Sequence, residues 1–225
     1  MNNAPGTELL DDPSADPVAV RRSLGNIARA NRLFGGTAAV LYGLDRLLAT
    51  GPSSGISLLD IGTGAGDIPA AARAWGIDRG VPVRTFGLER LRPAATLARD
   101  SRLPVTLGCA SALPFRSRSV DVVTISQVLH HCESASAVAL LRAATAVARR
   151  GVVVADLLRS GTAAFLFGVA SRALGFDHHT RVDGVTSVAR GYAPDELRAL
   201  ALAAGVAAEV TVRPGWRVVA WWPAA

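Results

Sequence analysis

Residues 58–69 read LLDIGTGAGDIP, and this stretch decides the fold. An apolar run ends at Asp60, glycines follow at positions 62, 64 and 66, and Asp67 stands next. Glycine has no Cβ atom, so the backbone can turn sharply there and approach a ligand closely. The stretch therefore predicts a strand, a ligand-binding turn and the start of a helix.

The charges that flank this turn indicate the kind of ligand it binds. The dinucleotide-binding pattern G-x-G-x-x-G would place its third glycine at position 67, where this chain has Asp67. A carboxylate at a helix start caps free N–H groups and competes with a phosphate for the same place. The phosphate-binding lysine loop is excluded as well, because the sequence contains no lysine. We therefore expect a ligand that has no phosphate at this turn and carries positive charge.

Short β-rich runs alternate with helical segments after residue 55. The expected strands cover residues 56–61, 82–89, 103–108, 120–128 and 151–158, and the expected helices cover 69–76, 92–100 and 134–150. This alternation predicts a parallel sheet with helices on both faces. A helix at 193–205 precedes two strands within 206–223, which are joined too tightly to be parallel. The predicted fold class is α/β, a Rossmann-like, seven-stranded, mostly parallel sheet with a C-terminal antiparallel hairpin.

The remaining segments are expected to be additions to one domain. Residues 1–16 are acidic and contain prolines, which favours a flexible N-terminus. Residues 17–54 read as two helices, 18–34 and 37–50, followed by a PSSG turn at 52–55. The main domain spans 55–225 and carries an insertion around 158–192, where an apolar helix at 162–176 precedes a polar segment. We expect the helical addition at 17–54 to form a lid.

Composition limits the class of partner. The formal net charge is +6, but the arginines are scattered, which indicates GC-rich coding and not a nucleic-acid-binding face. Cys109 and Cys132 show neither metal nor redox spacing, so we expect small buried residues in a reducing cytosol. The sequence shows neither a signal-peptide pattern nor an apolar run long enough to span a membrane. The expected protein is cytoplasmic, a monomer or homodimer, without nucleic-acid or membrane partners.

The motif D-I-G-T-G-A-G at residues 60–66 resembles the first motif of class I S-adenosylmethionine-dependent methyltransferases. The fold of that family is a seven-stranded sheet that ends in an antiparallel hairpin, and the resemblance covers roughly residues 55–222. It implies S-adenosylmethionine as the cofactor, a phosphate-free nucleoside whose sulfonium and ammonium suit the two acids. A nicotinamide-binding Rossmann domain is the alternative interpretation of the turn.

The same resemblance implies a set of cofactor-binding residues. Glu89 ends the second strand and would bind the ribose hydroxyls, although an acid at a helix start is the alternative. The segment GCASALPF has Cys109 where the family has an adenine-binding Asp, so Ala110 or Ser111 would take over. Asp121 is expected to be structural. The full predicted set is Asp60, Gly62, Thr63, Gly64, Gly66, Asp67, Glu89, Arg90, Ala110, Ser111, Ser126 and Gln127.

All four histidines occur as two adjacent pairs, and a neutral histidine suits proton removal near pH 7. We expect the catalytic base among His178, His179 and His130, with surface or helix-capping roles as the alternative. No metal is expected, because adjacent histidine side chains diverge and would not act together with Asp177 and Asp183. Candidate substrate contacts are Arg32, Phe34, His131 and Arg181.

The chain is also similar overall to bacterial methyltransferases associated with aromatic polyketide or quinone pathways. Together with these features, that resemblance implies an enzyme that methylates a small aromatic or polyketide-like acceptor, at a phenolic oxygen with histidine as general base. Carbon methylation of a quinol-type ring is a second interpretation. A nucleic-acid methyltransferase or binding module is a third, but SQVLHH at 126–131 replaces the Asn/Asp-Pro-Pro-aromatic motif of amino-methylating DNA enzymes. A non-catalytic protein that has kept the fold is the fourth.

Overall fold

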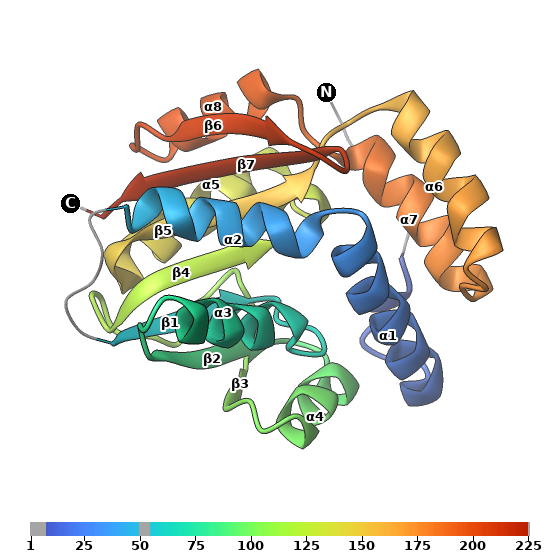
Figure 1. Cartoon of the computed structure of the whole chain (residues 1–225), viewed down its shortest axis with the longest axis horizontal. Coiled ribbons are helices and arrows are strands. Elements are labelled where there is room, and N and C mark those ends of the chain that lie inside the picture. Colours follow the sequence, from blue (N-terminus) through green and yellow to red (C-terminus); the bar gives the residue numbers. More distant parts are fainter. Residues whose placement is uncertain (1–7, 50–54, 225) are drawn as a thin grey trace.

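The computed structural model describes residues 8–49 and 55–224, and it contains the expected seven-stranded sheet (Figure 1). The strand order is β3-β2-β1-β4-β5-β7-β6, with β7 antiparallel to both of its neighbours. The first three residues of the predicted PSSG turn, 52–54, and residues 1–7 lie outside the described residues. The strands are β1 (Ile56–Ile61), β2 (Val83–Glu89), β3 (Val105–Leu107), β4 (Val120–Ser126), β5 (Ala148–Leu157), β6 (Glu209–Arg213) and β7 (Arg217–Pro223).

Helices cover both faces of this sheet, as the alternating pattern predicts. Helices α2 and α3 pack on one face and α5 and α8 on the other (Figure 1), and two clusters of buried hydrophobic side chains fill the space between. The helices are η1 (Leu9–Asp11), α1 (Pro17–Leu33), α2 (Gly36–Leu47), α3 (Asp67–Asp78), α4 (Arg92–Asp100), η2 (Leu129–His131), α5 (Ser134–Val147), α6 (Gly161–Ala173), α7 (His178–Arg190) and α8 (Pro194–Ala203). Among the described residues, no helix combines the length and apolarity needed to span a bilayer.

Strand β1 lies at the centre of the parallel part of the sheet, and all six of its residues are buried. Polar groups at the starts of β1, β4 and β5 are joined by Asp121. Its carboxylate accepts hydrogen bonds from the Ser57 amide (2.8 Å) and hydroxyl (2.6 Å) and from Arg149 Nε (2.9 Å). Asp121 is thus structural, as expected, and it connects three adjacent strands at the edge away from the strand ends where ligands bind.

The inserted segment is more ordered than the sequence indicates. The polar stretch after the apolar helix α6 forms a second helix, α7, and the two helices pack against each other. Asp177 caps α7 by accepting a hydrogen bond from the Thr180 amide (3.1 Å). The stretch looks like a loop in sequence because its stabilising contacts are to α1 and α6, which local composition does not reveal.

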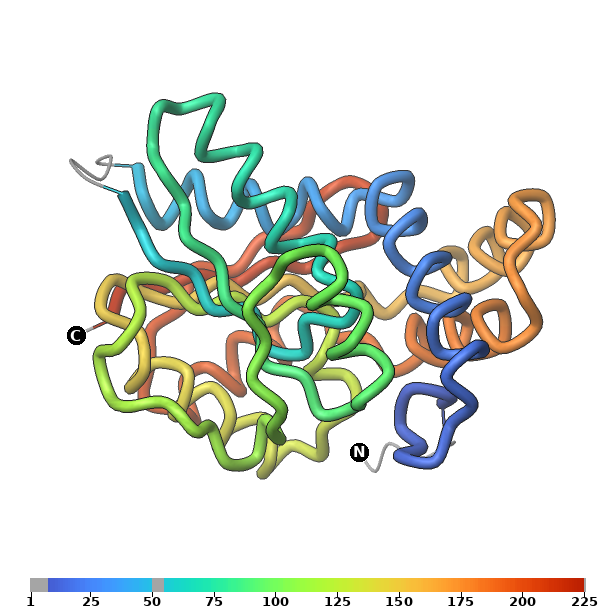
Figure 2. The backbone as a smooth tube through the Cα atoms, turned by 90° about the horizontal axis from the view of Figure 1, so that it is seen from below, coloured from blue at the N-terminus to red at the C-terminus, as the bar shows by residue number. Residues whose placement is uncertain are grey.

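Residues 8–16, here called the N-terminal strap, are ordered against α7, so the flexible N-terminus expected for 1–16 is wrong for this part (Figure 2). Glu8 is buried, and its carboxylate pairs with Arg190 (3.0 Å) and accepts the Ser187 hydroxyl (3.0 Å). The Leu9 amide donates to Asp183 (2.9 Å). Two acids of the strap, Glu8 and Asp11, thus have partners far along the chain, Arg190 and Arg90 among them.

Replacing Asp121 with Asn should lower stability above about pH 4. Burial raises the pKa of Asp121, but hydrogen bonds from Arg149 and Ser57 outweigh it and lower the pKa from 3.8 to about 2. The ionised carboxylate therefore stabilises the fold above pH 3.8, and this contribution is lost as the pH falls through about 2. We expect Asp121→Asn to cost roughly 1–2 kcal/mol at pH 7 in urea unfolding, with solvent screening keeping the loss modest.

The difference between Asp121→Asn and wild type should shrink steadily between pH 4 and pH 2, about the interval between the ordinary and the lowered pKa. A constant difference across that interval would show that Asp121 does not act through its charge.

Candidate functional site

A cavity of about 760 Å³ lies at the carboxyl ends of the central strands. The last residues of β1, β2, β4 and β5 all line it, which are Ile61, Glu89, Ser126 and Leu157. Strands β1 and β4 flank the point where strand order reverses, the usual ligand position in open α/β sheets. The N-terminal strap, α1, α6 and α7 also contribute to its walls.

The glycine turn forms one end of the cavity, and its backbone conformation needs glycine. Gly62, Gly64 and Gly66 have φ angles of +71°, +53° and +82°, which side-chain-bearing residues rarely adopt. A Cβ atom on Gly62 would lie 2.5 Å from Val128, and one on Gly64 would lie 3.1 Å from Leu24 of α1. The predicted close backbone approach is therefore present, and the helical addition packs over it.

Glu89 holds this turn through hydrogen bonds. One carboxylate oxygen accepts the Gly64 amide (2.9 Å), and the other accepts the amides of Arg90 (2.8 Å) and Leu91 (3.0 Å). The last two contacts lie at the start of α4, so the alternative role of an acid at a helix start is present too. Because a carboxylate accepts about four hydrogen bonds, one more donor can still be bound.

Asp60 is a buried acid beneath the turn and accepts the Thr124 hydroxyl (2.7 Å). Burial raises the pKa of Asp60 to about 7, and the carboxylates of Asp67 and Glu89 add to this rise. Thr63 lies close enough to lower the pKa of Asp60, but its hydroxyl makes no hydrogen bond of good geometry. Asp60 is therefore poised to ionise when a cation arrives.

Two hydroxyl groups in this part of the cavity are available for hydrogen bonds to a ligand. Thr63 Oγ1 and Ser126 Oγ are buried and have no hydrogen-bond partner among the described residues, and both residues line the cavity. Buried polar groups are nearly always hydrogen-bonded, so an orphaned pair at a cavity wall points to an absent polar ligand. Together with the acids and the open turn, they fit a nucleoside that carries amino-acid and hydroxyl groups.

A chain of hydrogen-bonded side chains connects helix α1 with the end of the glycine turn. Asn31 donates to Asp67 (2.9 Å) and accepts from Gln127, whose carbonyl oxygen accepts Arg217 Nη1 (3.0 Å). Arg217 Nε also donates to the Phe34 carbonyl (3.0 Å). Asp67 is the first residue of α3, but its carboxylate binds Asn31 and does not cap the helix, contrary to expectation. Helix α1 and the residue that follows it are thus hydrogen-bonded to both sides of the cavity.

His130 forms a buried pair with Asp156, which sequence analysis missed. His130 Nδ1 lies 2.7 Å from Asp156 Oδ1, and that oxygen also accepts the Leu157 amide (2.7 Å). Burial raises the pKa of Asp156, but the adjacent His130 and the Leu157 amide outweigh it and lower the pKa overall. The available signal was a lone acid near the end of an otherwise apolar strand, GVVVADLL.

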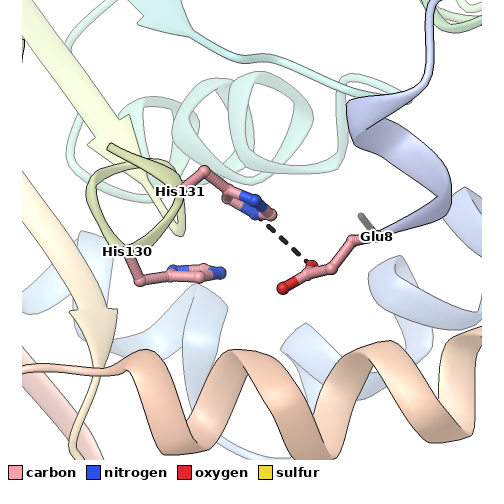
Figure 3. A group of neighbouring side chains, drawn as sticks. All are labelled: Glu8, His130 and His131. Carbon is pink, nitrogen blue, oxygen red and sulfur yellow. Dashed lines mark ion pairs between the residues drawn. The ribbon is translucent and has the colours of Figure 1, made fainter. Parts of the chain in front are cut away.

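His131 faces the N-terminal strap (Figure 3). Its Nε2 lies 3.7 Å from Glu8, and its Nδ1 lies 3.4 Å from Asp11. Burial lowers the pKa of His131, but the carboxylates of Asp11 and Glu8 outweigh it and raise the pKa. Potential ligand atoms of Glu8, His130 and His131 lie within 4.8 Å of one another. Because Glu8 already binds Arg190 and Ser187, the group is explained as the contact that holds the strap against the cavity.

The structure brings together most, but not all, of the predicted site residues. All twelve predicted cofactor positions except Gly66 line the cavity, as do Phe34, His130 and His131. His178, His179 and Arg32 are exposed and lie outside the lining, and Arg181 also lies outside it. The geometry gives no support to a base at 178 or 179, which begin a helix capped by Asp177. Cys109 is exposed on the cavity wall, not buried as expected, because it follows β3 in a loop.

Comparisons with known proteins agree with this geometry. A methyltransferase-domain family model matches residues 59–155. Demethylmenaquinone methyltransferase of Roseiflexus sp. (strain RS-1) is 31% identical over an alignment that covers 88% of this chain and 90% of the relative.

Two solved structures have similar folds at low sequence identity. A SAM-dependent methyltransferase from Aquifex aeolicus has a TM-score of 0.62 and 14% identity over 93% of this chain and 99% of that one. Magnesium protoporphyrin IX methyltransferase from Synechocystis, with bound SAM, has a TM-score of 0.55 and 13% identity over 88% and 81%. The motif, the sheet order, the cavity and the full-length relative agree: this chain belongs to the class I S-adenosylmethionine-dependent methyltransferases.

Proposed function

We propose that this enzyme methylates a small hydroxylated aromatic ring, with His130 removing the hydroxyl proton. The observation that carries the proposal is the buried His130–Asp156 pair on the wall of a cavity that also contains the glycine turn. In this proposal one cavity holds both the cofactor and the acceptor, so the base stands close to the reacting atoms.

The cofactor end is proposed to comprise the acidic turn and its neighbours. Asp60 offers a carboxylate to a cation, Glu89 retains room for a ribose hydroxyl, and Thr63 and Ser126 offer hydroxyls without partners. The loop at Ala110 and Ser111 supports adenine contacts, because both residues line the cavity. When bound, S-adenosylmethionine supplies an electrophilic methyl group on sulfur.

The acceptor end is apolar and bounded by the lid and the inserted helices. Phe34 and Phe167 meet edge to face, with ring centroids 5.9 Å apart, and Leu157, Ala163 and Val188 lie nearby in the lining. Aromatic walls of this kind favour a flat aromatic ligand. The polar groups of the pocket then fix its orientation.

His130 is arranged to accept a proton. A carboxylate only accepts hydrogen bonds, so Nδ1 of the neutral ring donates to Asp156 and Nε2 presents its lone pair. The ring is directed toward Glu8 and the cavity (Figure 3). When the acceptor O–H bond breaks, the proton passes to Nε2 and Asp156 stabilises the resulting imidazolium. Burial excludes water from this transfer.

The position that receives the methyl group has two candidates. Sequence reasoning favours oxygen, but a deprotonated aromatic hydroxyl also makes its ring carbon nucleophilic. The relative named demethylmenaquinone methyltransferase supports a quinone-related acceptor, for which methylation at a ring carbon is the second candidate. The same base serves both reactions.

The test supplies ¹³C-methyl-labelled S-adenosylmethionine with 1,4-naphthalenediol, simple phenols and RNA. Label in an aromatic product, assigned by NMR to oxygen or to ring carbon, supports the proposal and identifies the reaction. Label found solely in RNA would overturn it.

Placing an arginine in the glycine turn should block the cofactor. Gly64→Arg would direct a side chain into the space between the turn and Leu24, so S-adenosylhomocysteine affinity should fall at least about 100-fold, or about 3 kcal/mol. Gly80→Arg is the matched control, because Gly80 also has a positive φ (+66°) but faces open space. Equal loss of binding in both variants, measured by calorimetry, would count against this site.

Binding of S-adenosylmethionine should depend on the ionisation of Asp60. Because burial raises the pKa of Asp60 to about 7, the acid is largely protonated at pH 6 and must lose its proton to attract a cation. Affinity should therefore rise about tenfold between pH 6 and pH 8. Asp60→Asn mimics the protonated form, so it should bind weakly with a flat profile. An unchanged pH dependence in this variant would assign it to another group.

Removing the base should slow turnover without loosening the cofactor. His130→Gln and Asp156→Asn should each lower kcat by about 100- to 10,000-fold, since the first removes the proton acceptor and the second disturbs its tautomer. S-adenosylhomocysteine affinity should change little. His178→Gln and His179→Gln are matched controls, because both residues are exposed outside the cavity. Normal rates in the His130 variant would exclude it as the base.

A further inference from the structure

Arg217 is a buried cation that the proposed chemistry does not use. It begins β7, pairs in register with Leu157 at the end of β5, and is 4% exposed while lining the cavity. Burial lowers the pKa of Arg217 to about 10, and the nearby charge of Asp156 opposes this effect. The guanidinium therefore stays charged at neutral pH.

The hydrogen-bond partners of Arg217 are both uncharged. Nε donates to the Phe34 carbonyl and Nη1 to the side-chain carbonyl of Gln127, each at 3.0 Å. Within residues 8–49 and 55–224, no carboxylate forms an ion pair with Arg217, and Nη2 donates no hydrogen bond. An arginine has five donors, so several remain available at the cavity wall.

The acid that influences Arg217 is committed elsewhere. Asp156 binds His130 and the Leu157 amide, and it lies outside ion-pair distance of the guanidinium. A buried charge without a counter-charge in contact is strongly unfavourable in a folded protein. Its presence on the wall of a ligand cavity indicates that a ligand brings the counter-charge.

The surroundings indicate what that ligand is. Trp216 precedes Arg217 in the chain, and the carbonyl oxygen of Phe34 accepts a hydrogen bond from Arg217. Phe34 and Trp216 line the cavity together with Phe167 and Leu157. A cation at the edge of an aromatic pocket recognises an aromatic ring that bears an anionic oxygen. Asp156 lies near both groups, so the base and the cation act on neighbouring parts of one ligand.

We propose that Arg217 binds a ring-attached anionic oxygen, a carboxylate or an acidic phenolate, so that the acceptor is an aromatic acid. This inference rests on the proposed function, whose acceptor pocket it refines. Gln127 orients the guanidinium, and the oxygen anion accepts from Nη2. The substrate class is then a hydroxylated aromatic ring with a second, ionised oxygen.

The test compares 2-naphthoate with its neutral counterpart 2-naphthamide, titrated by calorimetry into enzyme saturated with S-adenosylhomocysteine. The wild type should bind naphthoate at least about tenfold more tightly than naphthamide. Arg217→Lys should keep part of this preference, because it retains the charge but loses the planar fork. Arg217→Gln should abolish the preference while changing naphthamide affinity little.

A second variant keeps the arginine and gives it a counter-charge within the protein. Gln127→Glu places a carboxylate at the atom that already accepts from Arg217, so the internal ion pair should also abolish the preference for naphthoate. It serves where Arg217→Gln fails to fold, which circular dichroism would reveal. An equal preference in the wild type and in Gln127→Glu overturns the inference, as does lack of naphthoate binding by the wild type at millimolar concentration.

The cofactor carboxylate is the competing source of an anionic oxygen. If Arg217→Gln weakens S-adenosylhomocysteine more than about tenfold, the arginine binds the cofactor and the acceptor assignment is overturned. These titrations need no turnover. A wild type without preference for naphthoate, or a preference that survives in Arg217→Gln, therefore counts against the role of Arg217 alone, whereas absence of methyl transfer to any aromatic probe counts against the proposed function alone.

Discussion

The hydrogen bond from the Gly64 amide to Glu89 determines what the strand-end cavity can bind. In phosphate-binding turns the backbone N–H groups face the ligand, and their positive ends attract an anion. Here an acidic side chain from the adjacent strand takes up the amide at the middle of the turn. The Gly64 amide is therefore not available to an anion, and the negative charge of Glu89 lies beside it, with Asp60 and Asp67 close by. The turn thus keeps the shape of a nucleotide site but reverses its charge preference.

The parts of the fold set by local pattern are the parts that could be predicted. Buried apolar runs between glycine-rich turns gave the strands, and β1 and α4 match their expected bounds, 56–61 and 92–100. The strap and α7 could not be predicted in the same way. Glu8 in the strap and Ser187 in α7 are far apart in the sequence and stabilise each other by a hydrogen bond. Composition does not reveal such a contact, so the strap looks flexible and α7 looks like a loop.

The residues of the site also separate into those that a local sequence motif predicts and those that it does not. Asp60, Glu89 and the glycines belong to a recognisable motif, and they line the cavity or shape its turn. Asp156 and Arg217 were missed because each stands within a strand among apolar residues, where sequence gives no sign of a functional side chain. His178 and His179 attracted attention as a pair, but their position at the start of a capped helix leaves them exposed. Buried charge, and not residue type, is the feature from which the acceptor end is proposed.

Helix α1 takes part in a chain of hydrogen bonds that joins the two proposed ends of the cavity. Asn31 on α1 bonds Asp67 at the cofactor end, and Gln127 joins Asn31 to Arg217 at the acceptor end. A ligand that displaces Arg217 from Gln127 changes the hydrogen bonding of the same side chain that donates to Asn31 on α1. The proposed acceptor and cofactor ends are thus connected by hydrogen bonds through the Gln127 side chain.

The most direct test of the account is the nucleoside preference of the purified protein, measured by calorimetry at pH 7.5 with S-adenosylmethionine, NAD and ATP titrated separately. The acidic turn predicts saturable binding of S-adenosylmethionine at micromolar concentration and no binding of the two phosphate-bearing nucleotides. Tighter binding of NAD or ATP at the glycine turn, lost in Gly64→Arg, would contradict the charge argument on which the cofactor, the base and the acceptor assignments all rest.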